Sequence, residues 1–195
     1  MIEEVILATR NEGKIKEFKS LLTGKVGEII SLRELESIPD VIEDGKSYAE
    51  NAIKKAREIC RQFNKVCLAD DSGLEVDALN GRPGIFSSRY GGNGTDDKEN
   101  IRKLLSELVS SSNRRARFVC NLALVYPDGR EIIAEGRCDG VILDKPRGES
   151  GFGYDPVFFI PELGKTMAEL TPEEKNRLSH RARAVDALML RINEI

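Results

Sequence analysis

The sequence lacks the features that mark membrane, secreted and zinc-binding proteins. It has no apolar run of about 18 residues, the length that a membrane-spanning helix requires. Its first residues, MIEEVILATRNEGK, have neither the basic segment nor the long apolar segment of a secretory signal peptide. The four cysteines form no C-x-x-C pair and there is one histidine, which excludes a structural zinc site of the usual spacing. We therefore expect a cytoplasmic protein with no membrane contact, whose cysteines are small buried hydrophobic residues.

An excess of positive charge is also missing. The 30 lysines and arginines are outnumbered by 33 aspartates and glutamates, for a net charge of −3. A protein that coats DNA or RNA needs a basic surface, so we expect no nucleic-acid partner. The length of 195 residues predicts a single domain, 1–195, and is enough to bury a sizeable core.

Strands and helices alternate along the chain. Apolar runs predict strands at 3–8, 28–32 and 65–70, and helical spacing predicts helices at 13–22, 46–63, 96–109 and 172–193. Residues 115–126 and 130–139 flank Pro127-Asp128-Gly129, a turn signature that predicts a hairpin. Residues 33–45 and 72–95 are expected to be loops. Because a hairpin interrupts the strand–helix alternation, the fold class is α/β with a mixed sheet.

Two polar segments follow predicted strands. Thr9-Arg10-Asn11-Glu12-Gly13-Lys14 joins a strand to a helix, and backbone N–H groups at a helix N-terminus suit a phosphate. The alternative is a plain strand–turn–helix connection with a solvated lysine. Leu68-Ala69-Asp70-Asp71-Ser72-Gly73 ends a strand in two carboxylates, which suit Mg²⁺. Since successive strand residues point to opposite faces, we expect only one of them to aim into a cleft; a turn or helix cap is the alternative.

Two further segments lie toward the C-terminus. Gly151-Phe152-Gly153-Tyr154-Asp155-Pro156 places two aromatic rings, which can stack on a purine, beside a carboxylate. A β-turn with both rings in the core is the alternative. Lys175-Asn176-Arg177-Leu178-Ser179-His180-Arg181 is a basic helical stretch, a pattern that is more often simply solvated. No G-x-G-x-x-G, Walker A or G-x-S-x-G pattern occurs in the chain. Together the four segments favour a purine nucleotide ligand.

These segments also resemble a known family. The matching residues are Thr9 to Lys14, Glu43-Asp44-Gly45, Glu50-Asn51-Ala52, Lys55-Ala56, Ala69 to Leu74, Gly81 to Ile85, Ser88-Arg89-Tyr90, Gly151 to Pro156 and Ser179-His180-Arg181. In this order, from residue 5 to about 190, they resemble the inosine triphosphate pyrophosphatase family of non-canonical purine nucleotide hydrolases. One departure is Thr9, where many bacterial members carry serine; the hydroxyl is retained.

The resemblance implies an elongated α/β fold, with two lobes around a mixed sheet, flanking helices and a central cleft. It implies a homodimer that uses Mg²⁺ to hydrolyse ITP, dITP and XTP to the monophosphate and pyrophosphate. By motif position Asp71 is the catalytic base and, with Glu43, a metal ligand. The implied substrate-binding residues are Thr9, Arg10, Asn11, Glu12, Gly13, Lys14, Lys55, Ser72, Phe152, Gly153, Tyr154, Asp155, Lys175, His180 and Arg181. Of these, Phe152 to Asp155, His180 and Arg181 are assigned to the base.

Two other functions are weighed against this one. The first is a non-catalytic nucleotide sensor on the same fold, and the second is a repair factor that reads deaminated bases in DNA. Retention of Asp71 and the lysines argues against a sensor, which needs no general base. The net charge of −3 argues against the DNA reader.

Overall fold

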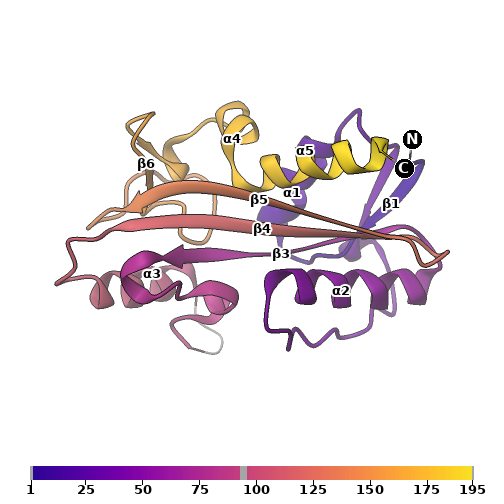
Figure 1. Cartoon of the computed structure of the whole chain (residues 1–195), viewed down its shortest axis with the longest axis horizontal. Coiled ribbons are helices and arrows are strands. Elements are labelled where there is room, and N and C mark those ends of the chain that lie inside the picture. The colour runs from indigo at the N-terminus through magenta and orange to yellow at the C-terminus, as the bar shows by residue number, and fades with distance from the viewer. Residues whose placement is uncertain (1, 93–95, 195) are drawn as a thin grey trace. The chain divides into compact units, whose positions relative to one another are not determined.

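Seven strands of the described residues form one sheet in the order β2-β1-β3-β4-β5-β6-β7 (Figure 1). The computed structural model describes residues 2–92 and 96–194. β1 pairs in parallel with β2 and β3, whereas β6 pairs antiparallel with β5 and β7, so the sheet is mixed as predicted. The strands are β1 Glu4–Leu7, β2 Glu28–Ser31, β3 Cys67–Val76, β4 Arg115–Val125, β5 Glu131–Ile142, β6 Phe158–Ile160 and β7 Lys165–Thr166.

Five α-helices and four short 3-10 helices accompany the described strands. The α-helices are α1 Glu12–Leu22, α2 Tyr48–Phe63, α3 Asp97–Glu107, α4 Pro172–Leu178 and α5 His180–Asn193. The 3-10 helices are η1 Leu32–Glu34, η2 Asp77–Leu79, η3 Gly84–Arg89 and η4 Met167–Glu169. Side chains of Asn11, Ser47, Asp96 and Thr171 cap the starts of α1, α2, α3 and α4, which explains why these helices begin where they do.

Two predictions about the elements are wrong. The helix predicted over 172–193 is interrupted at Ser179, whose extended backbone (φ −65°, ψ 157°) separates α4 from α5. The loop predicted over 72–95 begins too early, because β3 continues to Val76 and buries Leu74 and Val76. Ser72-Gly73 is typical of a turn, but the alternating apolar residues that follow favour a strand. Residues 93–95 of that range lie outside the described part.

The predicted hairpin turn is confirmed. Tyr126 N–H donates to Arg130 O (2.9 Å), and Gly129 takes the positive φ of 89° that such a turn favours. The four cysteines are buried, as predicted.

The chain divides into two compact units, and the single domain predicted for 1–195 stays a prediction. The first unit comprises the chain up to Asp71, Cys120–Gly136 and the chain from His180 onward. The second comprises Ser72–Val119 and Arg137–Ser179. None of the described helices is long and apolar enough to cross a membrane.

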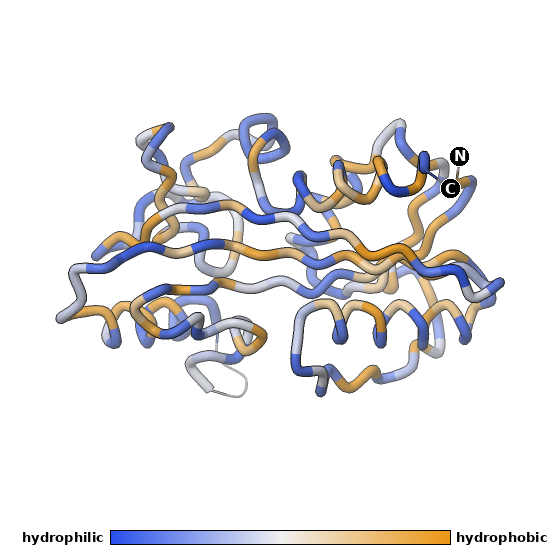
Figure 2. Tube along the Cα trace, viewed as in Figure 1, coloured by the Kyte–Doolittle hydropathy of each residue, from blue (hydrophilic) through white to orange (hydrophobic). Residues whose placement is uncertain are grey.

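Alternation along the strands of the first unit gives two separate cores. Val5, Leu7 and Leu68 lie in a core with α1 and α5, whereas Ile6 and Ala69 lie in another core with α2. Figure 2 shows hydrophobic residues recurring along α2 between hydrophilic ones. Helices therefore cover both faces of this part of the sheet, and a side chain's position along a strand decides which helix it meets.

The second unit has a single core. It joins Leu74 and Val76 of β3 to residues of α3, β4, β5, β6 and η4. Phe118 and Phe158 pack in it, with ring centroids 4.4 Å apart at 34°.

Candidate functional site

Asp70 and Asp71 lie on opposite faces of β3. Asp70 has the parity of Leu68 and faces α1 and α5, whereas Asp71 has the parity of Ala69 and faces α2. This is the alternation expected of a strand, and which of the two aims into a cleft stays a prediction. The two neighbouring carboxylates therefore have different partners.

Asp70 is surrounded by cations. It is fully buried, and Lys14 Nζ of α1 lies 2.7 Å from its Oδ2. Burial by itself would raise the pKa of this carboxyl, but Lys14, Lys55 and Arg181 outweigh it and lower the pKa to about 2. Asp70 is thus an ionised anchor for cationic side chains, which favours a structural role over that of a metal ligand.

Asp71 has a different environment. It is 7% exposed, and its Oδ2 accepts a hydrogen bond from Asn51 Nδ2 of α2 (2.9 Å). Burial raises its pKa and the negative charge of Glu43 adds to this, while Asn51 and Lys55 oppose it. Two adjacent carboxyls whose environments push their pKa values apart are a common arrangement for acid–base chemistry, and Asp71, whose pKa is raised, is the candidate proton acceptor.

Lys55 interacts with the carboxylates of Asp70, Glu43 and Asp71. Its Nζ lies 2.8 Å from Glu43 Oε1, and its side chain is only 13% exposed. Burial by itself would lower the pKa of Lys55, but Asp70 and Glu43 raise it, so the ammonium stays protonated. Its ammonium is a fixed positive charge that a phosphate oxygen can meet.

The segment from Thr9 to Lys14 forms the strand–helix junction predicted for it. Asn11 Oδ1 accepts from Lys14 N–H (3.0 Å) as the cap of α1, and Thr9 Oγ1 accepts from Asn11 N–H (3.2 Å). Arg10 is exposed near Asp40 (3.8 Å), and Glu12, which precedes Gly13, pairs with Arg33. The Asn11 side chain therefore organises this junction locally.

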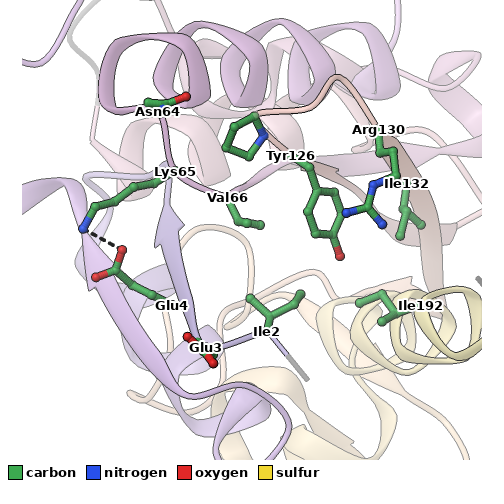
Figure 3. Close-up of a pocket in the computed structure, with 11 residues that line it drawn as sticks. Ile2, Glu3, Glu4, Asn64, Lys65, Val66, Tyr126, Arg130, Ile132 and Ile192 are labelled. Carbon is green, nitrogen blue, oxygen red and sulfur yellow. Dashed lines mark ion pairs between the residues drawn. The ribbon is translucent and has the colours of Figure 1, made fainter.

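A pocket of about 230 Å³ gathers several of these residues. Thr9, Arg10, Glu43 and Lys55 line it together with apolar residues that include Ile38 and Val41. A larger pocket of about 610 Å³ lies between residues such as Ile2, Tyr126 and Ile192, beside the Lys65–Glu4 ion pair (2.6 Å) (Figure 3). None of the predicted site residues lines the larger pocket, so the smaller one is the candidate site of the first unit.

The first unit also holds His180 and Arg181, at the start of α5. Both are buried, and Arg181 donates to Glu17 Oε2 of α1 (3.0 Å). Their assignment to base recognition stays a prediction. The structure shows in addition that Arg181 links α5 to α1.

In the second unit, Phe152 to Asp155 form a turn that is stabilised by hydrogen bonds to the side chain of Asp155. Asp155 Oδ2 accepts from Phe152 N–H (3.1 Å) and from Lys175 Nζ (2.6 Å), and the Lys175–Asp155 pair is buried. Gly153 N–H donates to Asp97 Oδ2 (2.7 Å). Ser72, the first residue of this unit, is half-buried in β3.

The two aromatic residues of this turn differ. Tyr154 is 4% exposed, and its hydroxyl donates to Ser87 O (2.7 Å), so its ring belongs to the core. Phe152 is partly exposed, with Lys175 Nζ 5.4 Å from its ring centroid. Of the two rings, Phe152 is therefore the candidate for stacking on a base.

The donor set fits a magnesium ion better than a transition metal. Within residues 2–92 and 96–194, no group of three or more histidine, cysteine and acidic residues is arranged to hold a metal. Mg²⁺ needs only one or two carboxylates because it keeps several waters. Glu43 is close enough to raise the pKa of Asp71, and a divalent cation would relieve this repulsion.

Asn51 is a polar contact of the candidate base that motif reasoning did not assign. A signal for it exists in α2, where Tyr48, Asn51, Ala52, Lys55, Ala56 and Ile59 share one helix face. An amide and an ammonium on an otherwise apolar face are expected to have buried polar partners. Here those partners are Asp71 and Glu43.

The fold and these side chains define an α/β protein in which two buried carboxylates of β3 meet lysines from the flanking helices α1 and α2, an arrangement suited to phosphate chemistry. The comparison with known proteins then gives the family. The profile of the Ham1 family matches residues 5–190, and the chain belongs to this family. The resemblance read from the motifs is confirmed over the same range.

Relatives and solved structures resemble this chain over nearly its whole length. The dITP/XTP pyrophosphatase of Geobacillus kaustophilus is 51% identical, over 96% of this chain and 93% of the relative. That of Desulfotalea psychrophila is also 51% identical, over 95% and 83%. A HAM1 protein from Coxiella burnetii superposes with a TM-score of 0.88 at 42% identity, covering both chains completely. The Staphylococcus aureus Ham1 protein gives 0.87 at 43%, over 98% of this chain and 99% of that one.

Proposed function

We propose that this chain is a nucleoside triphosphate pyrophosphatase that removes non-canonical purine nucleotides, namely dITP, XTP and ITP, from the nucleotide pool. Full-length relatives that are about half identical carry the name dITP/XTP pyrophosphatase. The observation that carries the proposal in the structure is the split environment of Asp70 and Asp71, beside Lys55 and Glu43. A non-catalytic sensor would not need this arrangement.

The proposed roles in the first unit concern the phosphates and the attacking water. Lys14 and Lys55 supply positive charge, Thr9 and Arg10 line the pocket, and the N-terminus of α1, from Asn11 to Gly13, adds N–H groups. Asp71 accepts the proton of a water that attacks the α-phosphorus. The α–β anhydride bond breaks, and pyrophosphate leaves while the nucleoside monophosphate is formed. Asn51 holds Asp71 through Oδ2.

Glu43 and Asp71 would hold Mg²⁺. When bound, Mg²⁺ neutralises charge on the triphosphate and increases the acidity of bound water. Lys55, paired with Glu43, supplies part of the same neutralisation from the protein itself.

Base recognition is proposed for Phe152 to Asp155 together with His180 and Arg181. Lys175 is proposed to contact the triphosphate, and Ser72 is a further substrate contact. Phe152 offers an aromatic face, and the Lys175–Asp155 pair fixes the turn that carries it. Hypoxanthine and xanthine have an acceptor oxygen at position 6, which matches the N–H donors of His180 and Arg181, whereas adenine has a donor there. The role of Asp155 is thus to hold the turn as well as to meet the ligand.

We also propose that the chain works as a homodimer in the cytoplasm, as the family resemblance suggests. Its four cysteines are buried thiols, which suits a reducing compartment. Light scattering coupled to gel filtration measures the assembly, and a mass of one chain would contradict the dimer.

The deciding experiment is a substrate panel. The purified chain is incubated with dITP, XTP, ITP, ATP and GTP, with Mg²⁺ and with a chelator, and both inorganic pyrophosphate and phosphate are measured. We expect pyrophosphate from the deaminated nucleotides with Mg²⁺ only. Release of phosphate would indicate a different bond cleavage, and binding without turnover would favour the sensor.

A further inference from the structure

We propose that Asn51 is a positioning residue that holds Asp71 and the acidic segment 43–46 in one fixed arrangement. Both ends of its amide are in use: Nδ2 donates to Asp71 Oδ2 (2.9 Å), and Oδ1 accepts from Gly45 N–H (2.8 Å). The side chain is 2% exposed. This inference rests on the proposed function, because it concerns the residues that the reaction would use.

The segment on one side of Asn51 is bonded to α2 at every residue. Glu43 pairs with Lys55 (2.8 Å) and Asp44 with Lys54 (2.6 Å), while Gly45 N–H bonds to Asn51 and Lys46 N–H to Glu50 (2.7 Å). The contact through Asn51 continues to β3 by the hydrogen bond to Asp71. Asn51 therefore joins the segment that carries Glu43 to Asp71, and these are the two carboxylates to which we assign the metal.

Gly45 provides a second observation. A Cβ at this position would lie 2.6 Å from Asn51 Oδ1, 2.9 Å from Glu50 Cβ and 3.1 Å from Asn51 N. Real Cβ atoms essentially never approach within 3.0 Å, and Glu50 Cβ and Asn51 N are held by the backbone at the start of α2, where little movement is possible. The backbone thus approaches the amide at a distance that only glycine allows.

The chemistry of the contacts requires an amide. A carboxylate at position 51 would still accept from Gly45 N–H but would place a negative charge against Asp71 instead of a donor. Leucine has a similar shape and makes neither bond. Asn51→Asp therefore removes the Asp71 contact alone, Asn51→Leu removes both, and Gly45→Ala disturbs the other end.

Ser47→Ala supplies the matched control. Ser47 Oγ caps α2 by accepting from Glu50 N–H (3.2 Å), so this substitution weakens the same helix without touching Asp71. Any effect that follows only from a less stable α2 appears in this variant as well.

The first test measures kcat, KM and melting temperature for hydrolysis of dITP with saturating Mg²⁺. For Asn51→Asp we expect kcat to fall about 10- to 100-fold with KM changed less than about threefold, because a misplaced base loses rate more than substrate affinity. Gly45→Ala should show a smaller loss of the same kind. Ser47→Ala should keep kcat within about twofold although it lowers the melting temperature. The proposal is overturned if Asn51→Asp keeps its kcat, or if Ser47→Ala loses as much.

The second test does not depend on activity. Hydrogen exchange of the Gly45 amide should accelerate in Asn51→Leu and stay unchanged in Asn51→Asp and Ser47→Ala, and a crystal structure of Asn51→Leu should show Asp71 in another rotamer. If wild type hydrolyses no triphosphate, the proposed function and the kinetic role of Asn51 both fail, while hydrogen exchange still decides whether Asn51 holds the Gly45 amide and Asp71. Unchanged exchange of the Gly45 amide and an unchanged Asp71 rotamer in Asn51→Leu would refute this positioning role even in an active enzyme.

Discussion

Two neighbouring aspartates show how the surroundings of a side chain decide its chemistry. Asp70 and Asp71 have the same covalent structure and lie one residue apart. Three cations keep the pKa of Asp70 low, whereas burial and Glu43 raise that of Asp71. Because a strand presents alternate residues to opposite faces, Asp70 pairs with Lys14 of α1, whereas Asp71 accepts from Asn51 of α2; Lys55 of α2 acts on both carboxyls.

Asp71→Asn should abolish turnover while the chain stays folded. The amide is nearly isosteric, but it accepts no proton and ligates Mg²⁺ poorly, and a general base typically contributes about 10²- to 10⁴-fold. Pyrophosphate release and the melting temperature are measured together. Near-normal activity in a folded variant would remove Asp71 from the mechanism.

Asp70→Asn is the companion variant, and here we expect loss of stability first. It leaves Lys14 without its buried counter-charge, and breaking a buried pair commonly costs about 3–5 kcal/mol. Urea unfolding measures the change. A stable Asp70→Asn protein that lacks activity would instead assign Asp70 to the chemistry.

Arg181→Ala tests selectivity against a structural role. If Arg181 reads position 6 of the base, the variant loses ITP turnover strongly and ATP turnover little, so the ratio of the two kcat/KM values falls. If Arg181 only joins α5 to Glu17 of α1, stability falls and the ratio of the two kcat/KM values is unchanged. We expect the ratio and the stability to fall together, measured by kcat/KM for ITP, ATP and GTP and by unfolding of the same samples.

Helices and strands in this protein are fixed by particular side chains at their ends. Ser179 separates α4 from α5, and the buried Lys175 at the end of α4 reaches Asp155 in the aromatic turn. At η1, Ser31 and Glu34 form a capping box, with Lys19 of α1 on the same carboxylate (3.1 Å). The contacts of Lys175 with Asp155 and of Lys19 with Glu34 join different elements of the chain.

Lys175→Met separates a structural role from phosphate binding. Removing the cation leaves the carboxylate of Asp155 buried and uncompensated, so we expect the free energy of unfolding to fall by about 3–5 kcal/mol. Chemical denaturation measures this, with Lys175→Arg as the charge-retaining control. An unchanged stability together with a raised KM would mean that Lys175 mainly contacts the triphosphate.

The capping box at η1 predicts a pH dependence of stability. Hydrogen bonds from Ser31, then Lys19, lower the pKa of Glu34 from 4.5 to about 2. The contribution of Glu34 is therefore complete above about pH 4.5 and is lost as the pH falls through about 2. Between these values the stability of Glu34→Gln should fall less steeply than that of wild type, as followed by thermal unfolding. Parallel curves would show that the interaction is absent in solution.

For the chain as a whole, the cores of the two units are formed by apolar side chains and do not include the proposed metal ligands. Removing Mg²⁺ with a chelator should therefore abolish turnover and leave the melting temperature within a few degrees, and adding Mg²⁺ back should restore activity. Circular dichroism and pyrophosphate release on the same sample check this. Unfolding on chelation would contradict a purely catalytic metal.

Much of the fold follows from local patterns in the sequence. Apolar periodicity predicted α1, α3 and the start of α4, and Pro127-Asp128-Gly129 predicted the hairpin turn. The structure shows the side chains that cap these helices, Asn11, Asp96 and Thr171. The family followed from motifs, because those residue types are required at fixed spacing. Local free energies of capping, turns and burial are enough for these features, since each involves residues that are close in the chain.

Other features depend on residues that only the folded chain brings together. The continuation of β3 through Ser72-Gly73 depends on the core that receives Leu74 and Val76, and the break at Ser179 overrides a helical pattern. The sequence placed Asp70 beside Asp71 but could not assign their partners. Lys14, Asn51 and Arg181 come from three different helices, and the electrostatic environment of a carboxyl depends on distances in space rather than along the chain.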